Sequence, residues 1–425
     1  GSSGFQTGST YKLFTLGAWL NSGKKLLDHV DGRVRQWDAG DFQARCGNVA
    51  TPWAPNNISK EPEDLTVVQA TALSVNTAFA DMAHQLDLCD IRDVAMAFGV
   101  HRADGNELSY VPSSILGINE IAPITMAAAI GGIANNGTFC TPIAIDKVVK
   151  RSTKTEMAIP TSKCSQAVTP EVSAGMLYAM KRVVSGGTGG ASSTGDGVML
   201  AGKTGTTDSG VHTWMTGAST AVATATWVGN VSGNTSLSRI SLNGKAGNTV
   251  RHDIWRSIMQ VANKQYPTGV FPNPPQSMID ATMITVPKVN GQAPSDAEQN
   301  ILINDLNAAI VVKKVPSSQP PGTVAYTRPS GGQVIPRGSQ VKIFVSAGGQ
   351  IKIPSTGVVG ETPDNAIATL IAAGFATANA PQPSQTQLFQ HSDTVPAGRV
   401  LGTIPAVGSS ASKDSAILLI ISTGP

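Results

Sequence analysis

Three short motifs combine serine, lysine, asparagine and threonine side chains in a pattern suited to acyl transfer. Their positions are Ser9 with Lys12, Ser74 with Asn76, and Lys203 with the Thr-Gly-Thr that follows it. A serine hydroxyl is a weak nucleophile that needs a base within hydrogen-bond distance. A lysine can be that base when burial or a neighbouring cation lowers its pKa. The motifs therefore predict a mechanism in which a serine is acylated.

We expect Ser9 to be the nucleophile and Lys12 to be its base. The apolar residues that follow predict a helix, on which a separation of three residues puts both side chains on one face. The N-terminus of that helix would favour the negative charge that develops during acylation. Ser-x-x-Lys recurs in a polar stretch and in the C-terminal repeats, which makes these copies poorer candidates: Ser22/Lys25, Ser339/Lys342 and Ser410/Lys413.

Ser74 and Asn76 follow a helix-like run over residues 62–73, and two interpretations of them stay open. In the catalytic one, Ser74 relays a proton between the lysines and the leaving group, and Asn76 hydrogen-bonds the amide backbone of the substrate. In the structural one, they form an ordinary N-cap for a helix over residues 77–88.

The third motif lies in a predicted strand over residues 198–207, which a turn at residues 208–210 connects to another strand. A lysine and hydroxyls on an exposed strand suit the binding of a terminal carboxylate. Lys203 would supply the charge, and Thr204 and Thr206 would hydrogen-bond the carboxylate oxygens.

Backbone groups near the third motif are also candidates for the site. Gly205 would let the substrate backbone approach the strand closely. The N–H groups of Ser9 and Thr206 would form an oxyanion hole, where losing one donor raises the barrier by about 3–4 kcal/mol. His212 and Trp214 would line the cleft, with a place in the core as the alternative for Trp214.

Two further segments are expected near the active site. The glycine-rich residues 186–190 lack the Gly-Lys-Ser/Thr ending of a phosphate-binding loop, so we interpret them as a flexible crossing. Residues 249–265 predict a helix that packs on the sheet through one apolar stripe, formed by Val250, Ile254, Ile258 and Val261.

Composition excludes several classes of function. The 425 residues are too many for a single core, and 31 Lys and Arg against 28 Asp and Glu leave a net charge of +3. This charge is too small to indicate nucleic-acid binding, and we expect no such partner. The six His are scattered and no Cys-x-x-Cys pair occurs, so we expect no metal and no cofactor.

The four cysteines permit two disulfides. We favour Cys140–Cys164, because residues 138–142 and 160–166 resemble the two ends of a short excursion, and Cys46–Cys89 then follows by elimination. Four reduced, buried thiols are the alternative. Disulfides would place the protein outside the cytoplasm.

One sequence pattern occurs twice after a proline-rich stretch over residues 265–277. Each copy starts with Val-Pro or Ile-Pro, has a helix-like middle, and ends in strand-like alternation that closes with Ser-x-Gly. We therefore expect a catalytic domain over residues 1–270, a linker over 271–282, and repeats over 283–348 and 349–425.

These two copies resemble PASTA domains, which occur on cell-wall transpeptidases and on bacterial receptor kinases. The resemblance implies small α/β modules and, in some members, binding of muropeptides or β-lactams. A spacer or a docking surface for the enzyme is an equally good interpretation, since neither copy shows a cluster of charged or aromatic residues that would make a ligand site.

The ordered motifs resemble the transpeptidase domain of class A penicillin-binding proteins, and the cysteines and tandem repeats look like those of actinobacterial members. Further stretches agree with this resemblance, at residues 8–12, 129–138 and 223–229. It implies an α+β fold in which helices flank an antiparallel sheet. The roles described above would carry over onto the matching positions: catalytic Ser9, Lys12, Ser74 and Lys203, and substrate-binding Asn76, Thr204, Gly205 and Thr206.

The resemblance implies a D,D-transpeptidase or carboxypeptidase that crosslinks peptidoglycan stem peptides, joining a D-Ala-D-Ala donor to an amine acceptor. β-Lactams would acylate it, and it would work at the outer face of the bacterial cell membrane or in the cell wall. Family members begin with a membrane anchor and a glycosyltransferase domain, and their sheets have strands before the nucleophile. None is visible before Ser9, so we expect a C-terminal portion whose membrane contact runs only through the missing part.

Two alternatives belong to other classes. A β-lactamase-like acyl-serine hydrolase would need a carboxylate base and typically has Asp inside the second motif, where this chain has Val75. A wall-sensing module would bind its ligand through the PASTA repeats while the catalytic half is dormant.

Overall fold

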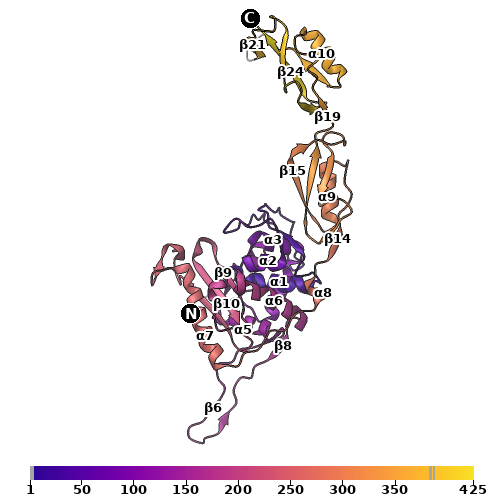
Figure 1. Cartoon of the computed structure of the whole chain (residues 1–425). Coiled ribbons are helices and arrows are strands. Elements are labelled where there is room, and N and C mark those ends of the chain that lie inside the picture. Colours follow the sequence, from indigo (N-terminus) through magenta and orange to yellow (C-terminus); the bar gives the residue numbers. More distant parts are fainter. Residues whose placement is uncertain (1–3, 382–384, 386–387) are drawn as a thin grey trace. The chain divides into compact units, whose positions relative to one another are not determined.

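The computed structural model describes residues 4–381, 385 and 388–425, and the chain divides into two compact units (Figure 1). The first unit comprises Gly1–Met283 together with Pro336–Ser339, and the second comprises Ile284–Ile335 and Gln340–Pro425. All three motifs therefore lie in the first unit, and most of both repeats lies in the second.

A three-stranded antiparallel sheet is the framework of the first unit. Its strands are β9 (Ala201–Thr206), β10 (His212–Ala218) and β11 (Ala223–Gly229), in the order β11-β10-β9. Neighbouring residues of β10 point to opposite faces. Trp214 lies in the main core, whereas Met215 lies in a smaller core that includes Trp255. Helices thus cover both faces of an antiparallel sheet, as the sequence predicted.

Several helices of the first unit pack around α1, which lies in the main core. Leu13, Phe14, Leu16 and Trp19 of α1 are completely buried, because this helix is apolar around nearly its whole circumference. None of the described helices combines the length and the apolar character that crossing a bilayer requires. The bounds are α1 (Lys12–Asn21), α2 (Val67–Leu73), α3 (Asn76–His84), α4 (Leu88–Ala97), α5 (Pro123–Ala134), α6 (Pro170–Gly186), α7 (Val250–Gln265) and α8 (Gln276–Ile279).

Short antiparallel strand pairs complete the first unit. They are β1 (Phe5–Gln6) with β4 (Glu120–Ile121), β2 (His29–Asp31) with β3 (Asp64–Thr66), β5 (Thr138–Cys140) with β8 (Cys164–Gln166), β6 (Val148–Val149) with β7 (Glu156–Met157), and β12 (Ser241–Leu242) with β13 (Lys245–Ala246).

Two disulfides are present, and both have the pairing that the sequence favoured. Cys140–Cys164 joins β5 to β8 at the base of an excursion that contains β6 and β7 and extends away from the body of the unit (Figure 1). Cys46–Cys89 ties the loop between β2 and β3 to α4.

Helix α7 packs on the sheet through a different face from the predicted one. Ile254, Ile258 and Val261 are 40%, 44% and 63% exposed. The buried face instead carries Trp255 and Met259, together with His252 and Ala262. The prediction was wrong because β-branched residues were counted as the core stripe. The space over Met215 is filled by the longer Trp and Met side chains, which lie on another face of the helix.

Each repeat of the second unit is a helix packed on one face of a small sheet. In the first repeat, α9 (Pro294–Ile303) covers β15 (Asn307–Val315), β18 (Gln340–Ser346) and β16 (Val324–Arg328), which pair in that order. In the second, α10 (Pro363–Ala372) packs against β24 (Ala416–Ser422), which pairs with β20 (Thr377–Asn379), β21 (Phe389–Gln390) and β22 (Val400–Ile404). The remaining pairs are β14 (Met283–Thr285) with β17 (Val334–Pro336), and β19 (Gln350–Lys352) with β23 (Ser410–Ser412).

The packing face of α7 can be tested with two neighbouring residues. Met259→Ala should lower the free energy of unfolding by about 2–5 kcal/mol, because it removes a completely buried side chain. Ile258→Ala should change it by roughly 0.5 kcal/mol or less, because that side chain is largely in solvent. Denaturant unfolding of both variants measures the difference, and the reverse order would contradict this packing.

Candidate active site

Ser9 lies in a tight turn that leads into α1. The turn is the 3₁₀ helix η1 (Gly8–Tyr11), so Ser9 precedes the first α-helical residue, Lys12. Ser9 is 8% exposed and lines a cavity, whereas Lys12 is completely buried beneath it. The sequence predicted one continuous helix, but the short 3₁₀ turn is what brings the hydroxyl to the surface of the cavity.

The ammonium group of Lys12 is bound by the second motif. It donates to the Ser74 carbonyl oxygen at 2.7 Å and to Asn76 Oδ1 at 2.6 Å, and it lies 3.4 Å from Ser74 Oγ. Within the described residues, no hydrogen bond joins Ser9 Oγ to Lys12 Nζ. Such contacts are commonly long before substrate binds. Lys12 is thus held in place by Ser74 and Asn76, directly below the nucleophile turn.

Ser74 occupies the junction between α2 and α3. It is the C-cap of α2 in the left-handed region, with φ 60° and ψ 38°. Its carbonyl and hydroxyl thereby both face lysines, since Lys203 Nζ donates to Ser74 Oγ at 2.6 Å. The N-cap of α3 is Val75, without a side-chain cap, so the N-cap interpretation of the motif is wrong. The preceding helix begins at Val67, because residues 64–66 form β3.

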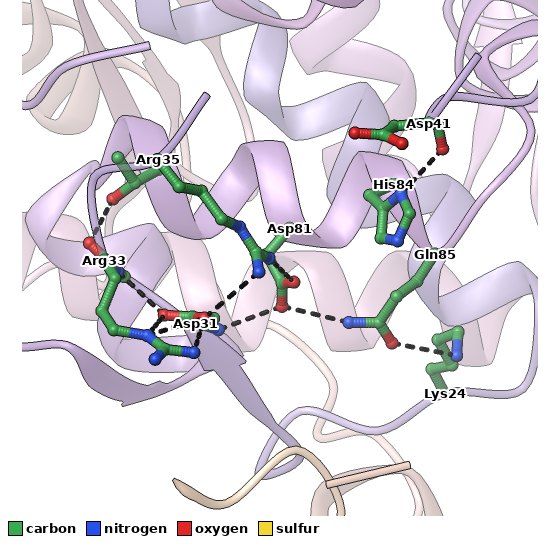
Figure 2. Close-up of polar contacts among 10 residues, drawn as sticks. Lys24, Asp31, Arg33, Arg35, Asp41, Asp81, His84 and Gln85 are labelled. Atoms are coloured by element: carbon green, nitrogen blue, oxygen red, sulfur yellow. Dashed lines mark hydrogen bonds and ion pairs between the residues drawn. The ribbon is translucent and has the colours of Figure 1, made fainter. Parts of the chain in front are cut away.

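A buried polar network anchors α3, whose first residue is Asn76. Asp81 on α3 accepts hydrogen bonds from the Asp31 N–H at 3.0 Å, from Arg35 at 2.8 Å and from Gln85 at 3.1 Å. Figure 2 shows the Asp81 carboxylate between Arg35 and Gln85, with Arg33 on Asp31 beside it. Burial raises the pKa of Asp81, and Arg35 opposes that effect. The network fixes α3 against the segment that follows β2.

Burial makes both lysines unusually acidic. It lowers the pKa of Lys12 well below its ordinary value, and the charge of Lys203 lowers it further. Burial and, to a smaller extent, Arg251 lower the pKa of Lys203 to about 7. Two cations that share one hydroxyl cannot both keep their protons easily. The lowered pKa favours the neutral amine of Lys12, which can accept a proton.

The cavity above these groups has a volume of about 220 Å³. Thr204 and Thr206 line it from β9, and Arg251 lines it from the first turn of α7. Arg251 donates to Thr206 Oγ1 at 3.1 Å, and Thr188 shares a 2.6 Å hydrogen bond with Thr204 Oγ1. The other lining residues are Ser9, Asn57, Ile58, Ser59, Glu61, Leu73, Ser74 and Val75.

Arg251 and Thr188 are site residues that sequence reasoning missed. Arg251 was assigned to a packing helix. The signal that could have found it is a cation in the first turn of a helix, where the helix dipole disfavours positive charge unless an anion is bound nearby. Thr188 lies in the predicted crossing at residues 186–190, which does pass beside the cavity. Trp214 is completely buried, and neither it nor His212 lines the cavity.

The backbone of β9 presents a free edge beside the nucleophile turn. β9 pairs with β10, and Thr207 N donates to His212 O at 3.1 Å. Hydrogen-bonded pairs alternate along antiparallel strands, so the N–H of Thr206 points away from β10. Ser9 and Thr206 both line the cavity. The backbone N–H groups of Ser9 and Thr206 therefore lie beside the same cavity.

Two glycines allow the turn and the strand to lie in contact. A Cβ on Gly8 would be 2.6 Å from the Thr206 carbonyl oxygen, and Gly8 has φ +54°. A Cβ on Gly205 would be 2.4 Å from the Thr7 carbonyl oxygen. Gly205 was predicted to make room for substrate, but in the structure it makes room for the nucleophile turn and does not line the cavity.

The site combines the hydroxyl of Ser9, two buried lysines and an arginine, a set of groups suited to an anionic substrate that acylates a serine. Among the described residues, no group of three or more His, Cys, Asp or Glu side chains is placed to hold a metal ion.

Residues 2–260 match the family of the penicillin-binding protein transpeptidase domain. The chain belongs to this family. Residues 284–347 and 356–423 match the PASTA domain.

Several relatives share this transpeptidase domain. Penicillin-binding protein 1A of Aquifex aeolicus is 29% identical over 61% of this chain and 35% of its own length. Penicillin-binding protein 1A of Mycobacterium tuberculosis is 28% identical over 64% of this chain and 34% of its own length. The chain thus spans about a third of the length of these relatives. The structure of PonA1 from M. tuberculosis with penicillin V is 25% identical, with a TM-score of 0.53 over 64% of this chain and 73% of that one.

Gly205 provides a test of the contact between the turn and the transpeptidase sheet. Gly205→Ala should lower the free energy of unfolding by about 1–3 kcal/mol, because the new methyl group would overlap the backbone of Thr7. Gly190→Ala is the matched control, since no atom lies within 4 Å of its added Cβ. Denaturant unfolding compares the two, and a Gly205→Ala protein as stable as the control would contradict this reading.

Proposed function

We propose that this chain is an acyl-serine D,D-transpeptidase that crosslinks peptidoglycan stem peptides and that β-lactams inactivate by acylating Ser9. The single observation that carries the proposal is the convergence of Lys12 and Lys203 on Ser74 beneath the cavity that Ser9 lines. Membership in the penicillin-binding transpeptidase family supports it.

In the first step, Ser9 Oγ attacks the carbonyl carbon of the penultimate D-Ala, and its proton passes to neutral Lys12. The N–H groups of Ser9 and Thr206 stabilise the oxyanion. The C–N bond then breaks, and the proton travels from Lys12 through Ser74 to the departing D-Ala amine. In the second step, an acceptor amine attacks the ester, forms the crosslinking amide and loses a proton, and Ser9 regains its hydroxyl.

The terminal carboxylate of the donor peptide binds where positive charge and hydroxyls meet. Thr204 and Thr206 hydrogen-bond it, while Lys203 and Arg251 supply the charge. Asn76 acts differently from the expectation of direct substrate binding: its Oδ1 holds Lys12 and its Nδ2 donates to Asn56 O at 2.7 Å. We therefore assign Asn76 first to positioning the base. Contact with the substrate amide would follow a rotation of its side chain.

The surroundings of the site fit a cell-wall substrate. Disulfides persist in oxidising compartments, so the two in this domain support a location outside the cytoplasm, at the outer face of the bacterial membrane or in the wall. A β-lactam combines a reactive amide with a carboxylate, and so offers the same two groups as a D-Ala-D-Ala terminus. The partners are thus stem peptides as donor and acceptor, and β-lactams as covalent inhibitors.

One observation favours a second candidate, hydrolysis of the acyl-enzyme. The carboxylate of Glu61 lines the same cavity and accepts a hydrogen bond from Ser59. A carboxylate near the ester could activate water as general base. The lifetime of the penicillin adduct, followed by intact mass, separates the two: persistence for hours supports the transpeptidase, and rapid loss supports the hydrolase.

The nucleophile is tested by labelling. Benzylpenicillin should add once to the chain, at Ser9, and Ser9→Ala should abolish the adduct because it removes the proposed nucleophile. Ser22→Ala is the matched control: Ser22 begins another Ser-x-x-Lys, yet its hydroxyl donates to Trp19 O, and labelling should persist. Intact mass with peptide mapping measures this, and an adduct on Ser9→Ala would refute the assignment.

The proposed contact between Arg251 and the carboxylate of the ligand can be tested by substitution. Arg251→Gln should lower the second-order rate of acylation by about 10- to 100-fold, the usual effect of losing a hydrogen bond to a charged group. It should hardly change the rate for the methyl ester of the same penicillin. Arg256→Gln, one turn along α7 and bonded to Ala191 O, is the control that should leave both rates unchanged. An equal loss for acid and ester would contradict a carboxylate contact.

A further inference from the structure

The first repeat carries an aromatic pair on the outer face of its sheet. Tyr326 of β16 and Phe344 of β18 are register partners, and their rings are stacked with centroids 4.6 Å apart. Both side chains are half-buried, on the face opposite the one that α9 covers. Stacked rings that keep contact with solvent offer a flat apolar surface.

Cations surround this pair. The Arg328 guanidinium lies 5.6 Å from both ring centroids, and Lys342 is its register partner on the neighbouring strand. Lys288 lies on the adjoining segment. In the part of the chain that the structure describes, none of these three forms an ion pair with an acidic side chain. Their charges are therefore available to an anion.

A cavity of about 330 Å³ opens beside the pair. Tyr326, Thr327, Lys288 and Asn290 line it, together with Ser330 and Gly331. Thr327 is 2% exposed, and its buried hydroxyl has no hydrogen-bond partner among the described residues. Thr327 is the register partner of Ile343, a residue of the core that α9 covers, so its side chain points away from the aromatic pair.

The second repeat lacks the aromatic pair and the two strand cations at the same positions. Its β22–β24 register repeats that of β16–β18, with Gly402 opposite Ile420 and Ile404 opposite Leu418. Gly402 and Ile420 thus replace the aromatic pair, and Ile404 and Leu418 replace the two cations. Thr403, the counterpart of the unpartnered threonine, donates to Pro405 O at 2.6 Å. The shared fold therefore does not require the cluster.

The two repeats also differ in net charge. Residues 283–348 contain six Lys and Arg against three Asp and Glu, whereas residues 349–425 contain three against four. The expectation that neither repeat has a charged or aromatic cluster was wrong for the first. The cluster's residues come from positions 288, 326–328 and 342–344, which only the folded sheet brings together.

We propose that this face of the first repeat binds an anionic carbohydrate, a polysaccharide that carries phosphate or carboxylate groups. The sugar rings pack on Tyr326 and Phe344, since aromatic faces and the C–H faces of sugars are complementary apolar surfaces. The anionic group binds Arg328 and Lys288. The site does not depend on the transpeptidase chemistry.

The test measures binding of the full chain to defined oligosaccharides by calorimetry. The probes are an oligogalacturonate and a phosphomannan oligosaccharide, which distinguish carboxylate from phosphate, with neutral dextran and inorganic polyphosphate as controls. At least one anionic oligosaccharide should bind at least about 10-fold more tightly than both controls. If polyphosphate binds as tightly as either anionic oligosaccharide, charge alone explains the binding and the proposal is overturned. Failure of both probes, or binding only when a peptide is attached to the sugar, would also overturn it.

Variants locate the site. Arg328→Gln should weaken binding of the anionic oligosaccharide by about 10- to 100-fold. Arg399→Gln, at an exposed arginine of the second repeat, should leave affinity unchanged. Equal effects of Arg328→Gln and Arg399→Gln would overturn the proposal. Thermal unfolding confirms that each variant is folded, and labelling at Ser9 separates this site from the proposed active site.

Discussion

The catalytic domain depends on one electrostatic constraint, the burial of two lysine ammonium groups around the hydroxyl of Ser74. Lys12 and Lys203 are both completely buried, and each lies within hydrogen-bonding reach of Ser74 Oγ. Burying like charges so close together is costly unless the pKa values fall and oxygen acceptors are supplied. The carbonyl of Ser74 and the amide of Asn76 supply those acceptors to Lys12.

The surrounding elements each satisfy part of that constraint. The apolar α1 carries Lys12 into the core, the left-handed C-cap of α2 turns Ser74 toward both lysines, and the edge strand β9 delivers Lys203. Gly8 and Gly205 let the backbones of turn and strand touch. A side chain at either glycine would overlap the opposite backbone and move the turn away from β9. The side chains of this site therefore lie together only while the turn and the strand stay in contact.

The two repeats show how one small fold can diverge in surface chemistry while the core stays the same. Their inward-facing residues remain apolar, with Val341 and Ile343 in one and Ile417 and Leu419 in the other. The outward-facing residues of the paired strands differ completely, because they are free of packing requirements.

Sequence alone determined the three motifs and the doubled C-terminal module, since these depend on local spacing and repetition, and the resemblance that they carry implied the α+β class. It also suggested the disulfide pairing. Only the tertiary structure decided that Arg251 reaches the cavity, that α7 buries Trp255 and Met259 rather than its β-branched stripe, and that Gly205 faces the nucleophile turn. It likewise assembled Tyr326, Phe344 and Lys288 on one surface. The reason is that local patterns specify which elements form, whereas the direction that each face points is set by packing between residues distant in the chain.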